Sequence, residues 1–157
     1  MDSKAALSEL AEALRDLHRR LVERMRRDDE RERRVVFSPR ELLQLLTSDA
    51  RFAWLHTLSE LIVDLDVFLK ADPSPTEDEA AAVRAEVERL ITAPQFPEIA
   101  SAFTQRYCGY VMEDMHIAAA HASVKQLAQR LPEAASVDEA KVLHERHRWA
   151  EARRHRR

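Results

Sequence analysis

The stretch PEIASAFTQRYCGYVMEDMHIAAAHASVKQLAQRL, residues 97–131, carries the most regular apolar pattern in the chain. Large apolar side chains recur at every seventh position, starting just before it: Phe96, Phe103, Tyr110, Ile117, Val124 and Leu131. Only a helix places residues at this spacing on one face. A second apolar row beside the first widens the face to that of a helix with several neighbours. The pattern predicts a long central helix over about 97–131.

The composition predicts an all-α fold. The 157 residues include only 1 glycine and are 34% charged and 45% hydrophobic. Alanine, leucine, glutamate and arginine dominate, and all four favour helices. A chain of this length can bury a core without metals or disulfides, and the single cysteine, Cys108, excludes both an internal disulfide and a cysteine-rich zinc module. We expect a helical bundle of five to six helices around the long central helix.

The first 34 residues combine a leucine edge with a run of charges. The edge has the alternating three- and four-residue spacing of a heptad seam, at Leu7, Leu10, Leu14, Leu17 and Leu21. Every residue from Arg26 to Arg34 is charged, so none of them is expected to be buried. Residues 1–34 are therefore predicted to form a charged amphipathic helix or arm. Its leucine edge either packs on the bundle or binds a protein partner or a second copy of the chain.

Residues 35–132 are predicted to form the bundle core. Ser38-Pro39-Arg40-Glu41 is a strong helix start signal, and Ser74-Pro75-Thr76-Glu77 repeats it. The helix expected over Arg51 to Lys70 is apolar around most of its circumference, which places it in the middle of the core against the Phe103 helix.

Residues 133–157 are predicted to form a peripheral C-terminal helix with a basic tail. The tail, HERHRWAEARRHRR, has six arginines, two glutamates and the aromatic Trp149. Arginines next to an aromatic ring can bind the phosphates and bases of a nucleic acid. The same charges can instead dock on an acidic protein surface, including that of another copy, or remain solvated.

Histidines and carboxylates interrupt the apolar faces of two predicted core helices. The candidate metal ligands are His56, Glu60, Glu113, Asp114, His116 and His121. Bundle metal sites are built from such groups on facing helices. The same residues can also be hydrogen-bonded boundary residues, tied to Tyr107 or Tyr110 or to a neighbouring backbone.

Part of this pattern resembles the hemerythrin family, in which bundle helices supply His-x3-Glu and paired histidines to a diiron centre. His56-Thr-Leu-Ser-Glu60 matches the first element, and the resemblance implies a metal-binding bundle. The chain departs from that pattern elsewhere, because His116 and His121 are five residues apart rather than four and no helix offers His-x4-Asp. Glu113-x-x-His116 supplies only one of the two Glu-x-x-His elements of ferritin-like diiron bundles.

The sequence offers little for catalysis. It has no glycine-rich phosphate loop, nucleophile elbow or dinucleotide fingerprint, and Cys108, two turns from His116, is the one possible nucleophile. No export signal and no apolar run of roughly 18 to 20 residues is visible. We therefore expect a cytoplasmic, non-enzymatic bundle of bacterial type, with no membrane contact and no specified cofactor, that oligomerises or binds a protein partner. A metal-binding bundle and a nucleic-acid-associated protein are the alternatives.

Overall fold

The computed structural model describes residues 2–93, 98 and 101–133. These residues form helices and no strands, which confirms the all-α bundle. The helices, in chain order, are α1 (Ser3–Arg33), α2 (Pro39–Ser48), the 3-10 helix η1 (Ala50–Leu55), α3 (His56–Lys70), α4 (Glu77–Ile91), α5 (Ala102–Glu113) and α6 (Met115–Gln129). None of these helices has the length and apolar character to cross a bilayer. The predicted C-terminal helix and the basic tail lie outside the described residues.

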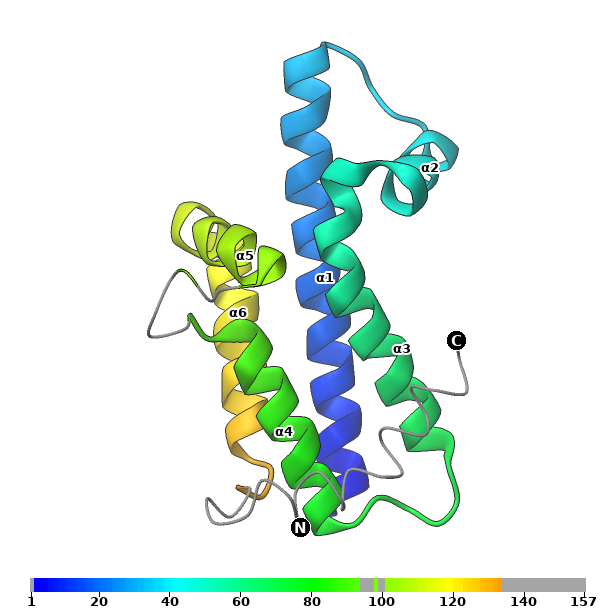
Figure 1. The fold of residues 1–157 in the computed structure, drawn as a ribbon, viewed down its shortest axis with the longest axis vertical. Coiled ribbons are helices and arrows are strands. Elements are labelled where there is room, and N and C mark those ends of the chain that lie inside the picture. The colour runs from blue at the N-terminus through cyan, green and yellow to red at the C-terminus, as the bar shows by residue number, and fades with distance from the viewer. Residues whose placement is uncertain (1, 94–97, 99–100, 134–157) are drawn as a thin grey trace.

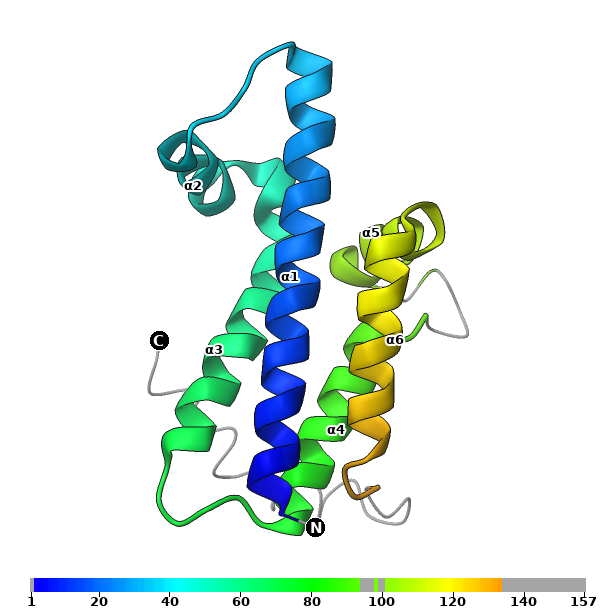
Figure 2. The same cartoon turned by 180° about the vertical axis from the view of Figure 1, so that it is seen from behind.

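The centre of the bundle is α1, the longest of these helices. It runs between α3 on one side and α6 on the other (Figures 1 and 2). Its leucine edge faces both neighbours, and all five of its leucines, from Leu7 to Leu21, are fully buried. The edge therefore packs on the bundle, which is one of the two arrangements that the sequence allows.

Burial on α1 decreases near Met25, as the charge pattern predicts. The C-terminal end of α1 extends past the ends of α3 and α6 (Figure 1). The prediction that no residue of the charged run is buried is wrong at Asp29, which is 7% exposed. Its Oδ1 lies 3.1 Å from Nε of Arg33 and 2.8 Å from Nη1 of Arg51, which reaches it from η1. Two guanidinium groups thus balance the charge that burial would otherwise destabilise.

The helix predicted over about 97–131 is two helices rather than one. The break is at Asp114, whose backbone is extended, with φ −125° and ψ 114°. The Asp114 carboxylate accepts hydrogen bonds from the N–H groups of His116 (2.9 Å) and Ile117 (3.2 Å), so it caps α6. In Figure 1, α5 lies across the end of α6 instead of continuing it. The apolar seam is nonetheless buried on both helices, at Phe103, Ile117, Val124 and Leu131.

An aromatic cluster joins η1 to α5. The Trp54 ring stacks on Tyr110 with centroids 5.8 Å apart and is tilted against Phe103 at 5.5 Å. Phe103 in turn stacks on Tyr107 at 5.2 Å. The predicted contact between the Trp54 helix and the Phe103 helix is therefore present at η1, whereas α3, the longer part of the predicted helix, packs against α1.

Candidate functional site

The first two candidate metal ligands lie on the solvent-facing side of α3. His56 is exposed, and its Nε2 donates a hydrogen bond to the carbonyl oxygen of Leu46, 2.9 Å away. This bond ties the end of α2 to the start of α3. Glu60, one turn later, is exposed as well. His56 therefore serves as a link between two helices.

Two further candidates, Glu113 and Asp114, lie at the junction of α5 and α6 and face Arg24 of α1. Nη1 of Arg24 donates to Oδ2 of Asp114 at 3.1 Å, and its Nη2 lies 3.7 Å from Glu113. Burial raises the pKa of Asp114, but the N–H of Ile117 and the Arg24 guanidinium outweigh it and hold the pKa below its usual value. Asp114 is thus an ionised helix cap that fastens α1 to α6.

The remaining candidates, His116 and His121, point in different directions from α6. His116 is exposed in the first turn, whereas His121 is half-buried, with its Nδ1 2.6 Å from the hydroxyl of Tyr107. Burial lowers the pKa of His121 and raises that of Tyr107, so both are neutral near pH 7. A neutral imidazole nitrogen accepting from a tyrosine hydroxyl is a satisfied boundary contact between α5 and α6.

The structure does not bring the six candidates together as a metal site. All six lie in the described part of the chain, and within that part no group of three or more His, Cys, Asp or Glu side chains is placed to hold an ion. Cys108 is a free, half-buried thiol on α5. His56, Asp114 and His121 instead cap helices or join them, while Glu60 and His116 are exposed.

The leucines expected to bind a partner are not on the surface. Leu7, Leu10, Leu14, Leu17 and Leu21 each have 0% exposure within a single chain. A protein could reach them only if α1 separated from α3 and α6. A partner-binding role therefore needs a different surface.

The segment from Val35 to Leu46 provides such a surface. Val36 is 83% exposed, Leu43 61% and Val35 44%, while Phe37 and the other three leucines of α2 are half-exposed. No residue of α2 is buried. We call this set the α2 surface: Val35, Val36, Phe37, Leu42, Leu43, Leu45 and Leu46. Contiguous exposed apolar side chains on a soluble domain typically mark an interaction site.

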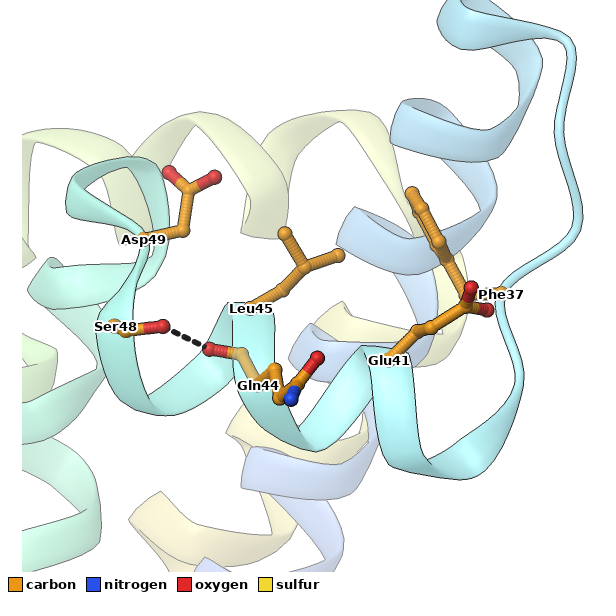
Figure 3. A pocket seen from close by; sticks show the side chains of 6 residues that line it. All are labelled: Phe37, Glu41, Gln44, Leu45, Ser48 and Asp49. Carbon is orange, nitrogen blue, oxygen red and sulfur yellow. Dashed lines mark hydrogen bonds between the residues drawn. The ribbon is translucent and has the colours of Figure 1, made fainter.

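A hollow of about 410 Å³ adjoins the α2 surface and shares Phe37 and Leu45 with it. Figure 3 shows Asp49, Leu45 and Phe37 in a row along one side of α2, with Glu41 beside Phe37. Gln44 and Ser48 complete the lining, and the Ser48 hydroxyl donates to the carbonyl of Gln44 at 2.6 Å. The hollow thus has two apolar side chains, Phe37 and Leu45, among polar ones, with a carboxylate at each end.

Local hydrogen bonds hold α2 in place without burying it. Ser38 and Glu41 form a capping box, as the sequence predicts, with Ser38 N–H to Oε2 of Glu41 at 2.8 Å and Glu41 N–H to Oγ of Ser38 at 3.2 Å. Before it, the N–H of Phe37 donates to Oε1 of Glu30 on α1 at 3.0 Å. After it, His56 bonds Leu46. α2 is therefore a formed helix, anchored at both ends and by Leu45 and Leu46, which pack partly against the core, while Leu43 remains exposed.

Sequence reasoning identified this helix and its cap but not its exposure. The short length of this helix is the signal that could have revealed its exposure. A helix of ten residues with four leucines needs a close neighbour to cover them, and the loop before it is apolar as well. The sequence does not show which helices pack against one another.

Comparisons with known proteins assign neither a family nor a function to this chain. No protein-family model, no curated protein and no solved structure matches this chain. The function must therefore be argued from the surface itself.

Proposed function

We propose that this chain is a non-enzymatic helical-bundle protein that binds a protein partner through the α2 surface. The observation that supports this most is the exposure of Val36 and Leu43 on a segment in which no α2 side chain is buried. Exposed apolar side chains that lie together on a soluble domain contribute little to the fold and mark interaction sites.

The chemistry of the hollow favours one class of partner. Phe37 and Leu45 offer an apolar contact in it, and Glu41 and Asp49 stand at its ends. Asp49 already pairs with Arg51 at 2.8 Å, whereas the Glu41 carboxylate accepts the N–H of Ser38, which lowers its pKa and keeps it charged. An amphipathic helix with apolar anchors and at least one basic residue fits this arrangement, by the helix-in-groove mode. The partner is either another protein or a basic segment of a second copy.

Site-specific photo-cross-linking tests the proposal in cells that naturally make the protein. A photoreactive phenylalanine analogue is placed at position 36 or 43 of the full chain, and at Glu60 as an exposed control on α3. We expect positions 36 and 43 to yield the same adduct and the control to yield none. The adduct mass separates a second copy from a different protein. Equal labelling at all three positions, or none at 36 and 43, would refute the proposal.

The purified adduct partner then gives an affinity measurement. We expect Leu43→Asp to weaken binding by at least about tenfold, which corresponds to about 1.4 kcal/mol. Val63→Asp on α3 is the control, since Val63 is also an exposed aliphatic residue (39%) but lies outside the α2 surface. An unchanged affinity for the Leu43 variant would overturn the assignment of this surface.

A further inference from the structure

Two neighbouring rows of side chains run along α2. Residues three, four and seven positions apart share one side of a helix. An outer row, in which every side chain is exposed, consists of Arg40, Leu43, Gln44 and Thr47. A hollow row, in which every side chain lines the hollow, consists of Glu41, Gln44, Leu45 and Ser48. Gln44 belongs to both rows, so it marks the line between them.

The two rows have complementary chemistry. The outer row presents Leu43, which is 61% exposed, one turn from Arg40. No carboxylate of the described residues pairs with Arg40. The hollow row presents Leu45 next to Phe37, between two carboxylates (Figure 3). The outer row is therefore a helix face with an apolar anchor and a basic residue, which is the kind of partner that the hollow favours.

A two-fold axis at Gln44 would place the outer row of each copy on the hollow row of the other. In a symmetric dimer, a contact from residue i to residue j is repeated from j to i, so one surface must carry both halves of the contact. When two copies of α2 run antiparallel across Gln44, Leu43 of each copy lies opposite Leu45 of the other. The α2 surface and its hollow thus contain both halves.

The charged groups are matched by the same register. Arg40 of each copy lies opposite Ser48 of the other and next to Asp49, one of the two carboxylates at the ends of the hollow. Asp49 already binds Arg51 at 2.8 Å, and a carboxylate has acceptor sites for a second guanidinium. Antiparallel helices also bring opposite ends of their dipoles together. Apolar and charged contacts therefore agree on one arrangement.

We propose that the partner of the α2 surface is a second copy of this chain, bound as an antiparallel pair of α2 helices around a two-fold axis at Gln44. This inference rests on the proposed function and selects one partner for the same surface. Val35 and Val36 precede α2, so they extend the contact at both ends of the pair. The segment from Val35 to Asp49 is shorter than the roughly 20 to 30 residues that a standard interface uses on each side, so the dimer is weak and reversible.

Sedimentation equilibrium of the purified full chain, with no other protein present, measures this association. We expect a monomer–dimer equilibrium with a Kd of about 1 to 100 μM, as for a small and transient interface. A monomer at every concentration up to about 1 mM would overturn the dimer. The proposed function would still stand if the photo-cross-linked adduct then contained a different protein, so the two failures are distinguishable.

Substitutions on the outer row test the surface. Leu43→Asp should weaken the dimer at least about tenfold, because it replaces an apolar contact by a charge, and Arg40→Glu should do so because it places two carboxylates together. Val63→Asp, an exposed position of α3 outside the α2 surface, should leave the Kd unchanged. Circular dichroism and urea unfolding verify that each variant is folded. An unchanged Kd for Leu43→Asp or for Arg40→Glu would refute the assigned contacts.

A disulfide tests the axis, because a residue on a two-fold axis lies next to its own counterpart. In a Cys108→Ser background, which removes the native thiol, Gln44→Cys should form a covalent dimer in oxidised glutathione. Glu60→Cys, an exposed position on α3, is the control and should remain monomeric. No covalent dimer at position 44, or equal yields at the two positions, would contradict the antiparallel pair.

The basic tail of a second copy is the other occupant that charge favours, and its arginines test it. The full chain with Arg153→Gln, Arg154→Gln, Arg156→Gln and Arg157→Gln loses four of the six arginines of the tail. The α2 pair uses none of them, so we expect an unchanged Kd. A dimer weakened tenfold or more by these changes would identify the tail as the occupant and overturn the α2 pair.

Discussion

Two leucine-rich helices of this molecule have opposite roles. On α1 all five leucines of the seam are fully buried, whereas on α2 none of the four leucines is buried and Leu43 is 61% exposed. Both helices are amphipathic, and both begin with a side-chain cap, Asp2 or Ser38. The difference lies in their neighbours, because α1 runs between α3 and α6, while α2 packs beside η1 at the edge of the bundle (Figure 2).

This comparison shows that an apolar sequence pattern identifies the apolar face of a helix but not the element that packs on that face. The α1 edge continues for five leucines and reaches two long helices, so its burial contributes to the global fold. The α2 edge is one short helix held by bonds at its ends. Leu45 and Leu46 pack partly against the core, but Leu43 is 61% exposed, which is the basis of the proposed function.

The largest expected effect is the difference between a leucine-to-alanine change on α1 and one on α2. Leu14→Ala should cost about 2 to 5 kcal/mol of the free energy of unfolding, because it leaves a cavity in a packed interior. Leu43→Ala should change that energy by less than about 0.5 kcal/mol, as for other surface positions. Urea denaturation of the full chain measures both. Similar losses in the free energy of unfolding at the two positions would contradict the opposite roles of α1 and α2.

The second prediction concerns Asp114, which fastens α1 to the rest of the bundle. Asp114→Ala removes the cap of α6 and leaves Arg24 without this partner, so we expect a loss of about 2 to 4 kcal/mol. Asp114→Asn keeps a capping oxygen and should lose less. Urea denaturation is suitable because it does not screen the ion pair. Equal losses for the two variants would show that the cap contributes nothing.

The third prediction uses His18, which lies beside the leucine edge of α1 with its Nε2 2.8 Å from the hydroxyl of Ser59 on α3. Burial lowers the pKa of His18 in the folded chain, and that of His121 is lowered as well. Below the usual histidine pKa of about 6.5 the unfolded chain therefore binds more protons than the folded one. The free energy of unfolding should therefore have its full value above that pH and should decrease as the pH falls through and below it.

The measurement is the free energy of unfolding in urea at several pH values between about 7.5 and 5.5, the range around the usual histidine pKa. His18→Gln should make the decrease shallower, and His18→Gln with His121→Gln shallower still. A decrease of the same steepness in all three proteins would contradict the assigned burial of these histidines.

The smallest expected effect is at the cap of α2. Ser38→Ala removes a bond to the N–H of Glu41 and should destabilise this helix locally by about 1 kcal/mol. The ¹³Cα chemical shifts of Leu42 to Leu46 should move toward coil values. Global unfolding should be unaffected, because α2 buries no side chain. A comparable loss in global unfolding would show that α2 belongs to the cooperative core.

Much of the fold could be predicted from the sequence, because local signals are strong. The cap at Ser38 and the end of α3 at Lys70 are where the sequence places them. The start of α4 is near the prediction, although Thr76 rather than Ser74 is the N-cap, paired with Glu79. These features depend on neighbouring residues, which a sequence shows directly.

The break at Asp114 could not be predicted from periodicity. Apolar residues keep the same seven-residue spacing on both sides of it, and neither proline nor glycine marks it. The available signal was Asp114 itself, since aspartate is a preferred N-cap residue. Its place beside an apolar seam suggested a ligand instead.

The exposed surfaces depend on how the helices pack in the tertiary structure, so they could not be predicted from the sequence. Leucine spacing suggested an interface at the helix that proves to be the centre of the bundle. The exposure of the segment from Val35 to Leu46 follows only from which helices pack together.

Native-state hydrogen exchange of the full chain tests the central claim most directly, by comparing the amides of Leu14 to Leu21 with those of Leu43 to Thr47. The account predicts that the α1 amides exchange only through global unfolding, while the α2 amides exchange through local opening at a free energy lower by several kcal/mol. Equal protection of the two helices, with the same denaturant dependence, would place α2 in the core and contradict its role as a docking surface.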